Sequence, residues 1–283
     1  FPTRRSSDLF KDLKELLTRS VTGFIYAATL LGSVLIGSWT FFAVYLILCG
    51  LALHEYLILA KREGSKPAMV LAIVLGIWPL LNSFLVHQFQ ISGTLYAGIA
   101  VLLLALFIVE LIRNTGKPFV NIAASTLGLF YIGIPFGLLS ELAHSPYKDG
   151  FAPELIAFLL LILWIFDTGA YLTGSLIGRT PLFKRISPKK TWEGFLGGLV
   201  LGSVAIFILS KIIDLVPPGH LWLYGMAIMI FGTLGDLIES MWKRSLGVKD
   251  SGNALPGHGG WLDRLDSLLL AIPALYLCLL ILG

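Results

Sequence analysis

The sequence predicts an all-α, polytopic integral membrane protein: a helical bundle of about nine transmembrane helices with its N-terminus in the cytoplasm. Three observations predict it, namely an apolar composition, nine apolar stretches of membrane-spanning length, and a one-sided distribution of Lys and Arg. The chain is 56% hydrophobic and 13% charged, and its mean hydropathy is +0.84. Because this leaves too little polar surface to cover a water-soluble globule, a bilayer is the expected solvent.

The apolar stretches have the length that a membrane helix needs. About 20 residues cross a bilayer, since each residue of a helix advances roughly 1.5 Å. None of the stretches alternates apolar and polar residues as a membrane β-strand would. In chain order they are residues 21–37, 39–60, 68–86, 94–112, 118–142, 153–177, 192–213, 221–242 and 265–282.

The positions of Lys and Arg predict the orientation. If the connecting segments alternate between the two sides, 19 of the 21 Lys and Arg fall on one side and only Lys148 and Lys211 on the other. Cytoplasmic loops carry the positive excess, so the N-terminus and the long basic loops are expected in the cytoplasm. The prediction is an integral protein of the cytoplasmic (inner) membrane whose active site faces the cytoplasm.

The chain is expected to hold one domain. Residues 1–15 lack the apolar region of a signal peptide and are interpreted as an N-terminal remnant or cytoplasmic arm. Residues 16–283 are expected to form a single membrane domain, with N-terminal helices over 16–142 and catalytic helices and loops over 153–283. The basic residues follow the membrane face, so we expect no nucleic-acid binding.

Residues 236–266 are unusually charged for this chain. Their acidic residues lie beside membrane-length apolar segments, where an unpaired charge is costly. The directions of the expected helices put Asp167, Asp236, Glu239, Asp263 and Asp266 in the cytoplasmic half of the bilayer. Crowded carboxylates repel unless cations lie among them, and Mg²⁺ commonly uses one or two carboxylates plus substrate phosphates. The pattern therefore predicts a divalent-metal site for a phosphate ligand, in preference to an ordinary charged loop.

The neighbouring residues suit a phosphate group. Gly257, Gly259 and Gly260 permit close backbone approach and lead into a helix N-terminus, which favours anions. Cationic donors in the same segment are Lys243, Arg244, Lys249 and Arg264. A second basic loop, RISPKKTWEG, brings Ser187, Lys189 and Lys190 to the same side of the membrane.

Several residues keep a second interpretation. Instead of serving the site, Asp167 could pair with another group inside the bundle. His258 could serve only to shape the turn in which it lies. The Lys and Arg of the basic loop could serve only to set the orientation of the protein in the membrane and to attract anionic lipid. His54 and Glu55 are expected to be solvated at the interface and are left out of the site. Small residues four apart are expected to pack the sixth and seventh helices together: Ala170, Gly174 and Gly178 against Gly194, Gly198 and Gly202.

The charged segment resembles the signature of the phosphatidate cytidylyltransferases, also called CDP-diacylglycerol synthases. The matching residues are Ser240, Lys243, Arg244, Lys249, Asp250, Gly252, Pro256, His258, Gly259, Gly260, Asp263, Arg264 and Asp266. SPKKTWEG and the IFDTGAYLTG segment around Asp167 match as well, and the resemblance covers most of the chain from about Leu16. Trp242 and Trp261 depart from the pattern, where an aliphatic residue or Phe is expected.

The resemblance implies a membrane enzyme that joins CTP to phosphatidate and releases pyrophosphate and CDP-diacylglycerol. It implies that Asp236, Asp263 and Asp266 hold Mg²⁺, with two cations expected and the second of unknown identity. Lys249, Arg264 and Lys190 are the expected phosphate contacts. Further substrate contacts are expected at Ser187, Lys189, Lys243, Arg244, His258, Gly259, Gly260 and Asp167. A polyprenol-type lipid kinase and an ion-coupled transporter stay as alternatives, and a homodimer is kept open.

Overall fold

A computed structural model describes residues 6–91, 96–144, 150–214, 216–252, 254 and 259–282, in which every expected apolar stretch is helical. A π-helical turn at Leu129–Gly133 joins α5 to α6, so that these two form one continuous helical segment. The helices are α1 (Ser6–Ile36), α2 (Ser38–Arg62), α3 (Met69–Phe89), α4 (Ala97–Arg113), α5 (Pro118–Gly128), α6 (Ile134–Leu142), α7 (Glu154–Ile177), α8 (Trp192–Leu209), α9 (Pro218–Ser245) and α10 (Leu262–Leu282).

Seven helical segments in the described part of the chain are long and apolar enough to cross a membrane. They are α2, α3, the continuous α5–α6 segment, α7, α8, α9 and α10. The other two expected spans correspond to Ser20–Ile36 of α1, a shorter apolar helix, and to α4, which has 17 residues. The structure therefore confirms a polytopic helical membrane protein, and the count of nine spans stays a prediction.

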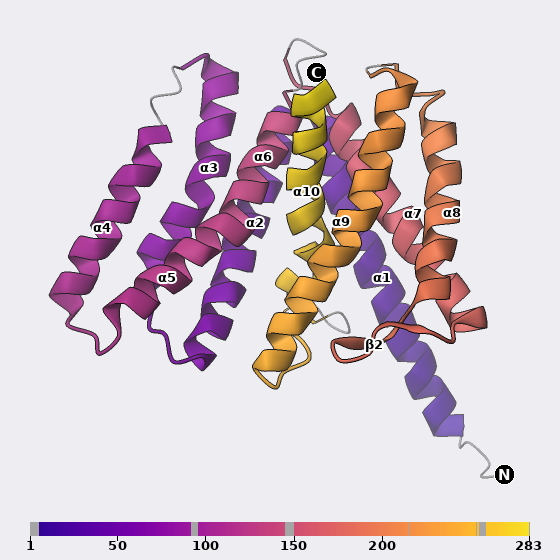
Figure 1. The fold of residues 1–283 in the computed structure, drawn as a ribbon, viewed down its shortest axis with the longest axis horizontal. Coiled ribbons are helices and arrows are strands. Elements are labelled where there is room, and N and C mark those ends of the chain that lie inside the picture. The colour runs from indigo at the N-terminus through magenta and orange to yellow at the C-terminus, as the bar shows by residue number, and fades with distance from the viewer. Residues whose placement is uncertain are drawn as a thin grey trace.

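The helices run side by side as a bundle, with the two termini at opposite ends (Figure 1). The N-terminus lies at the same end as the β-hairpin and the C-terminal end of α9. Helices α7 and α8 pack most extensively on each other, as do α9 and α10. These two pairs bring the charged segments of the sequence to one end of the molecule.

The basic loop between α7 and α8 is a β-hairpin, which the all-α prediction did not include. Strand β1 (Pro181–Phe183) pairs antiparallel with β2 (Ser187–Thr191). The Glu193 carboxylate accepts the backbone N–H groups of Arg179 and Thr180 at 3.1 Å and so fixes the start of the hairpin. At its end, the Thr191 hydroxyl accepts Gly194 N–H at 3.1 Å and caps α8.

The small residues of α7 and α8 pack as expected. A Cβ on Gly194 would lie 2.8 Å from the Ala170 carbonyl oxygen and 3.1 Å from the Gly174 Cα, so the two backbones are nearly in contact. Further along α8, a Cβ on Gly202 would meet the sulfur of Met229 on α9 at 2.2 Å. Glycine is therefore required at Gly194, because a side chain there would push the backbone of α7 away from α8, whereas at Gly202 the flexible Met229 side chain would have to move.

Candidate active site

The close approach of α9 and α10 brings two of the predicted acidic residues together. A Cβ on Gly235 would lie 2.4 Å from the carbonyl oxygen of Asp266, so only glycine allows the helices to meet at this point. Asp236 follows this contact directly on α9, while Asp266 lies on α10. Both residues line a cavity of about 590 Å³. The helix packing itself therefore holds these two acidic residues near each other.

This first cavity collects most of the residues that the sequence singled out. Its walls come from α1, α7, α9, α10 and the segment between α9 and α10, and they carry both acidic and basic groups. The charged residues among them are Asp167, Asp236, Lys243, Arg244, Lys249, Asp250, Asp263, Arg264 and Asp266. The structure thus places acidic residues from α7, α9 and α10 around one hollow, together with cations of the kind that bind phosphate.

A second cavity of about 540 Å³ lies between α7, α8 and the hairpin. Aromatic and aliphatic residues form much of its wall, including Phe166, Tyr171 and Phe195. Ser187, Lys189 and Lys190 of β2 also line it. Asp167 and Asp236 line both cavities, so the two hollows adjoin at these acidic residues.

Asp236 is held from two sides. Lys190 of the hairpin forms an ion pair with its Oδ2, and the Ser240 hydroxyl, one turn further along α9, donates to its Oδ1 at 3.2 Å. The hairpin therefore contacts the acidic residues directly, through a lysine and a carboxylate. A bound phosphate would compete with Asp236 for the Lys190 ammonium group.

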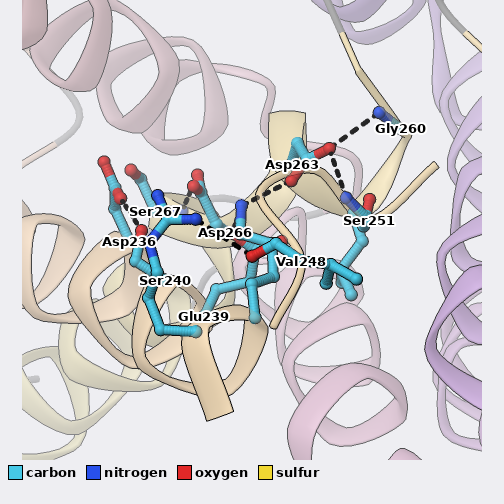
Figure 2. Close-up of polar contacts among 12 residues, drawn as sticks. Asp236, Glu239, Ser240, Val248, Ser251, Gly260, Asp263, Asp266 and Ser267 are labelled. Atoms are coloured by element: carbon cyan, nitrogen blue, oxygen red, sulfur yellow. Dashed lines mark hydrogen bonds and ion pairs between the residues drawn. The ribbon is translucent and has the colours of Figure 1, made fainter. Parts of the chain in front are cut away.

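Asp263 is bonded by the protein itself. Its Oδ1 lies 2.5 Å from Lys243 Nζ, and its Oδ2 accepts N–H groups from Ser251 at 2.9 Å and Gly260 at 2.8 Å. Figure 2 shows this carboxylate turned toward Ser251 and Gly260. Lys243 also lies 2.5 Å from Glu239 Oε2, and the Glu239 side chain is fully buried. Asp263 therefore fastens the segment between α9 and α10 onto Lys243.

The three aspartates consequently differ in what they offer a metal. Within the described residues, no three or more His, Cys, Asp or Glu side chains are arranged to hold an ion. Asp236 and Asp266 both line the first cavity, and Asp266 accepts Ser267 N–H at 2.6 Å through Oδ1. This pair fits the two carboxylates that Mg²⁺ commonly takes beside substrate phosphates. Asp263 fits less well, because it is held by two backbone N–H groups as well as by Lys243. Among the described residues, by contrast, Asp236 is engaged only by the side chains of Lys190 and Ser240.

Of the remaining predicted residues, the structure describes some and leaves others out. Arg244 donates to the Val248 carbonyl oxygen at 2.9 Å, and Arg264 and Lys249 line the first cavity. Gly259 has a φ of 80°, and a Cβ there would lie 2.6 Å from Asp263 Oδ2, so glycine is required for a structural reason. His258 and Gly257 lie outside the described residues.

Two residues near the site were missed by the sequence analysis. Tyr26 of α1 donates its hydroxyl to the Arg264 carbonyl oxygen at 3.0 Å, and nothing distinguishes it from the other aromatic residues of the chain. Glu55 was expected to be solvated, but its exposed fraction is only 8% and its Oε2 accepts hydrogen bonds from Ser251 and Leu262. An acidic residue within an apolar helix was the available signal. His54 beside it is exposed, as expected.

Comparison with known proteins identifies the family of this chain. The family model described as "Cytidylyltransferase family" matches residues 17–282. The chain belongs to the cytidylyltransferase family. It is similar to the phosphatidate cytidylyltransferase of Bacillus subtilis, at 36% identity over 95% of this chain and 98% of that protein. It is also similar to the phosphatidate cytidylyltransferase of Staphylococcus haemolyticus, at 34% identity over 93% and 98% respectively. The resemblance read from the motifs is confirmed.

Proposed function

We propose that this nucleotidyltransferase transfers the cytidylyl group of CTP to phosphatidate, giving CDP-diacylglycerol and pyrophosphate. The observation that carries the proposal is the pair of unlike cavities that adjoin at Asp167 and Asp236. The charged cavity suits the triphosphate of a nucleotide, and the apolar cavity suits a lipid chain. A reaction that joins a nucleotide to a lipid needs both kinds of surface beside one reacting centre.

The reaction needs no nucleophile from the protein. An ionised phosphate oxygen of phosphatidate attacks the α-phosphorus of CTP, and the bond from that phosphorus to the bridging oxygen of the β-phosphate breaks. The negative charge that develops on the departing pyrophosphate must be neutralised. Lys190, Lys249 and Arg264 line the two cavities and can supply that positive charge. Their work is to position the two substrates and to stabilise charge.

We infer that Mg²⁺ belongs to this site, held by Asp236 and Asp266 together with substrate phosphates. When bound, the ion would draw the phosphate groups together and offset their charge. Asp263 supports the same site by holding Ser251, Gly260 and Lys243, and the identity of a second cation stays open. Asp167 lines both cavities, and we assign it to substrate positioning.

We infer nine membrane crossings, an N-terminus in the cytoplasm and a site that opens to the cytoplasm across the inner membrane. The one-sided Lys and Arg support this, as do termini at opposite ends of the bundle, since an odd number of crossings separates them (Figure 1). The hairpin and the segment between α9 and α10 then face the compartment that supplies CTP.

The direct test gives purified protein CTP, phosphatidate and Mg²⁺ in detergent micelles and measures the products. CDP-diacylglycerol with equimolar pyrophosphate is expected, and Asp266→Asn should reduce it to background. Release of CDP with a phosphorylated lipid would instead establish a lipid kinase. Nucleotide-independent ion flux in vesicles, without either product, would establish a transporter. Omitting Mg²⁺ should also stop the reaction.

A further inference from the structure

Glu55 is an acidic residue of α2 that reaches the signature segment from the other half of the chain. It lies near the C-terminal end of α2, and its exposed fraction is 8%. A buried carboxylate requires hydrogen-bond donors, since leaving it without them costs more than its hydrogen bonds contribute. The identity of those donors therefore tells what Glu55 does.

One donor comes from the segment between α9 and α10, and the other is the first residue of α10. Ser251 Oγ donates to Glu55 Oε2 at 2.9 Å, and Leu262 N–H donates to the same oxygen at 3.0 Å. These residues lie 196 and 207 positions away in the sequence. Leu262 is the first residue of α10, whose initial N–H groups have no partner within the helix. Glu55, which belongs to α2, thus caps the N-terminus of α10, the helix that carries Asp263 and Asp266.

The backbone around Glu55 leaves no room for side chains. A Cβ on Gly260 would lie 2.3 Å from Glu55 Oε2, and one on Gly252 would lie 2.8 Å from Glu55 Oε1. The carboxylate is therefore enclosed by two glycines of the signature. Gly260 was expected to let a substrate approach, and that stays a prediction; within the protein, Ser251 Oγ and Glu55 Oε2 lie nearest to the position of its missing Cβ.

The same contacts continue to Asp263. Ser251 gives its hydroxyl to Glu55 and its backbone N–H to Asp263, while Gly260, in contact with Glu55, gives its N–H to Asp263. We propose that Glu55 is a positioning residue for the reaction: by accepting Ser251 Oγ and Leu262 N–H, it fixes the segment between α9 and α10 and the start of α10. It touches no substrate and acts through Asp263 and Asp266.

The test compares two changes at Glu55 with a matched control on the same helix end. Glu55→Ala removes the acceptor, whereas Glu55→Gln keeps a carbonyl oxygen that can accept both hydrogen bonds. The control is Glu63→Gln, because Glu63 accepts Trp242 Nε1–H at 2.9 Å but makes no described contact with the segment. All three are purified in detergent and assayed with CTP, phosphatidate and Mg²⁺.

We expect Glu55→Ala to lower kcat by about 100-fold while KM for phosphatidate stays within about 2-fold, because two buried hydrogen bonds are lost away from the lipid cavity. Glu55→Gln should recover kcat to within about 5-fold of wild type, and Glu63→Gln should remain within about 2-fold. A folded Glu55→Ala protein with wild-type kcat would overturn the proposal. So would an equal loss in the Gln and Ala variants.

Hydrogen exchange tests the positioning role even if the purified protein shows no activity in the enzyme assay. In Glu55→Ala, the backbone N–H groups of Ser251, Gly260 and Leu262 should exchange faster, while Glu63→Gln should leave them unchanged. The expected effect of Glu55→Ala on kcat rests on the proposed function, whereas its expected effect on hydrogen exchange does not. If wild type makes no CDP-diacylglycerol, the proposed function fails, and unchanged exchange in Glu55→Ala would separately refute the positioning role.

A second variant covers the case in which Glu55→Ala does not fold. Ser251→Ala removes one of the two donors to Glu55 and should lower kcat by about 10-fold. Wild-type activity of Ser251→Ala would refute the positioning role.

Discussion

Two clusters of ionisable side chains lie at opposite ends of the bundle, and they differ in what their charges face. At one end, acidic and basic groups from α7, α9 and α10 line a cavity. At the other, where α3 and α6 end, Glu141 accepts Tyr96 OH at 2.8 Å and lies 2.9 Å from His87 Nε2. The His87 and His144 rings stack with centroids 4.3 Å apart. The groups of this distal cluster contact one another and come from α3, α6 and the start of α4. Charged groups that line a cavity can serve a ligand even where some of them are paired, whereas the distal groups are satisfied by one another and serve packing.

The largest expected difference is in catalysis. Asp236→Asn should lower kcat by about 10²- to 10³-fold, since a carboxylate that faces the cavity is removed. Its unfolding temperature should change little, because the lost ion pair with Lys190 is offset by relief of the repulsion from Asp266. Glu141→Gln in the distal cluster should leave kcat unchanged. Product formation and thermal unfolding measured in the same detergent check both, and a fall in kcat for Glu141→Gln would erase the distinction.

A large loss of stability is expected where a paired charge is buried within the active-site end. Lys243→Met leaves Glu239, which is fully buried, without its cation. Such an unpaired charge typically costs about 3–5 kcal/mol, so the protein should unfold at a much lower temperature. The double change Lys243→Met with Glu239→Gln should restore part of the loss. Equal stability of the single variant and wild type would show that the pair does not hold this end together.

An intermediate effect is expected from the helix contact that positions Asp236 and Asp266. Gly235→Ala places a methyl group 2.4 Å from the Asp266 carbonyl oxygen, so α9 and α10 must separate. We expect kcat about 10-fold lower and a higher Mg²⁺ requirement, because misplacement of about 1 Å costs heavily. Gly219→Ala on the same helix is the matched control, since nothing lies within 4 Å of its Cβ. Equal activity of the two variants would argue against close approach as the cause.

The smallest expected effect is a pH dependence of the distal cluster. Burial lowers the pKa of His144, and the neighbouring His87 lowers it further. The folded state therefore favours neutral His144, so stability is retained above the ordinary pKa of about 6.5 and is lost as the pH falls below it. The unfolding temperature should drop between about pH 7.5 and about pH 5.5, and His144→Phe should reduce that drop. An identical drop in both proteins would exclude His144 as its source.

Much of the fold could be predicted because a bilayer imposes simple rules. Long apolar runs must be helical, and helices that alternate in direction fix which acidic residues lie at the same end. That is why Asp167, Asp236 and Asp266 could be placed together from spacing alone. The glycines of α7 and α8 were equally informative, since small residues four apart indicate close packing.

The missed features depend on contacts that spacing does not encode. The hairpin has short polar strands without a periodic pattern, and it is held by Glu193 through backbone groups. Asp263 and Asp266 are both aspartates, so the sequence does not tell them apart. Asp263 differs because its carboxylate is bonded by Lys243, Ser251 and Gly260. Glu55 lies 207 residues from Leu262, and nothing in the local sequence of either residue predicts their contact.

The bond from α2 to the first turn of α10 limits how far this enzyme can be treated as modular. A chimera that took its C-terminal half from one relative and its N-terminal helices from another would carry every residue of the signature. It would still depend on an inherited acceptor at the end of the second helix. Exchanges of this kind should succeed only when the donor and recipient chains match at that junction.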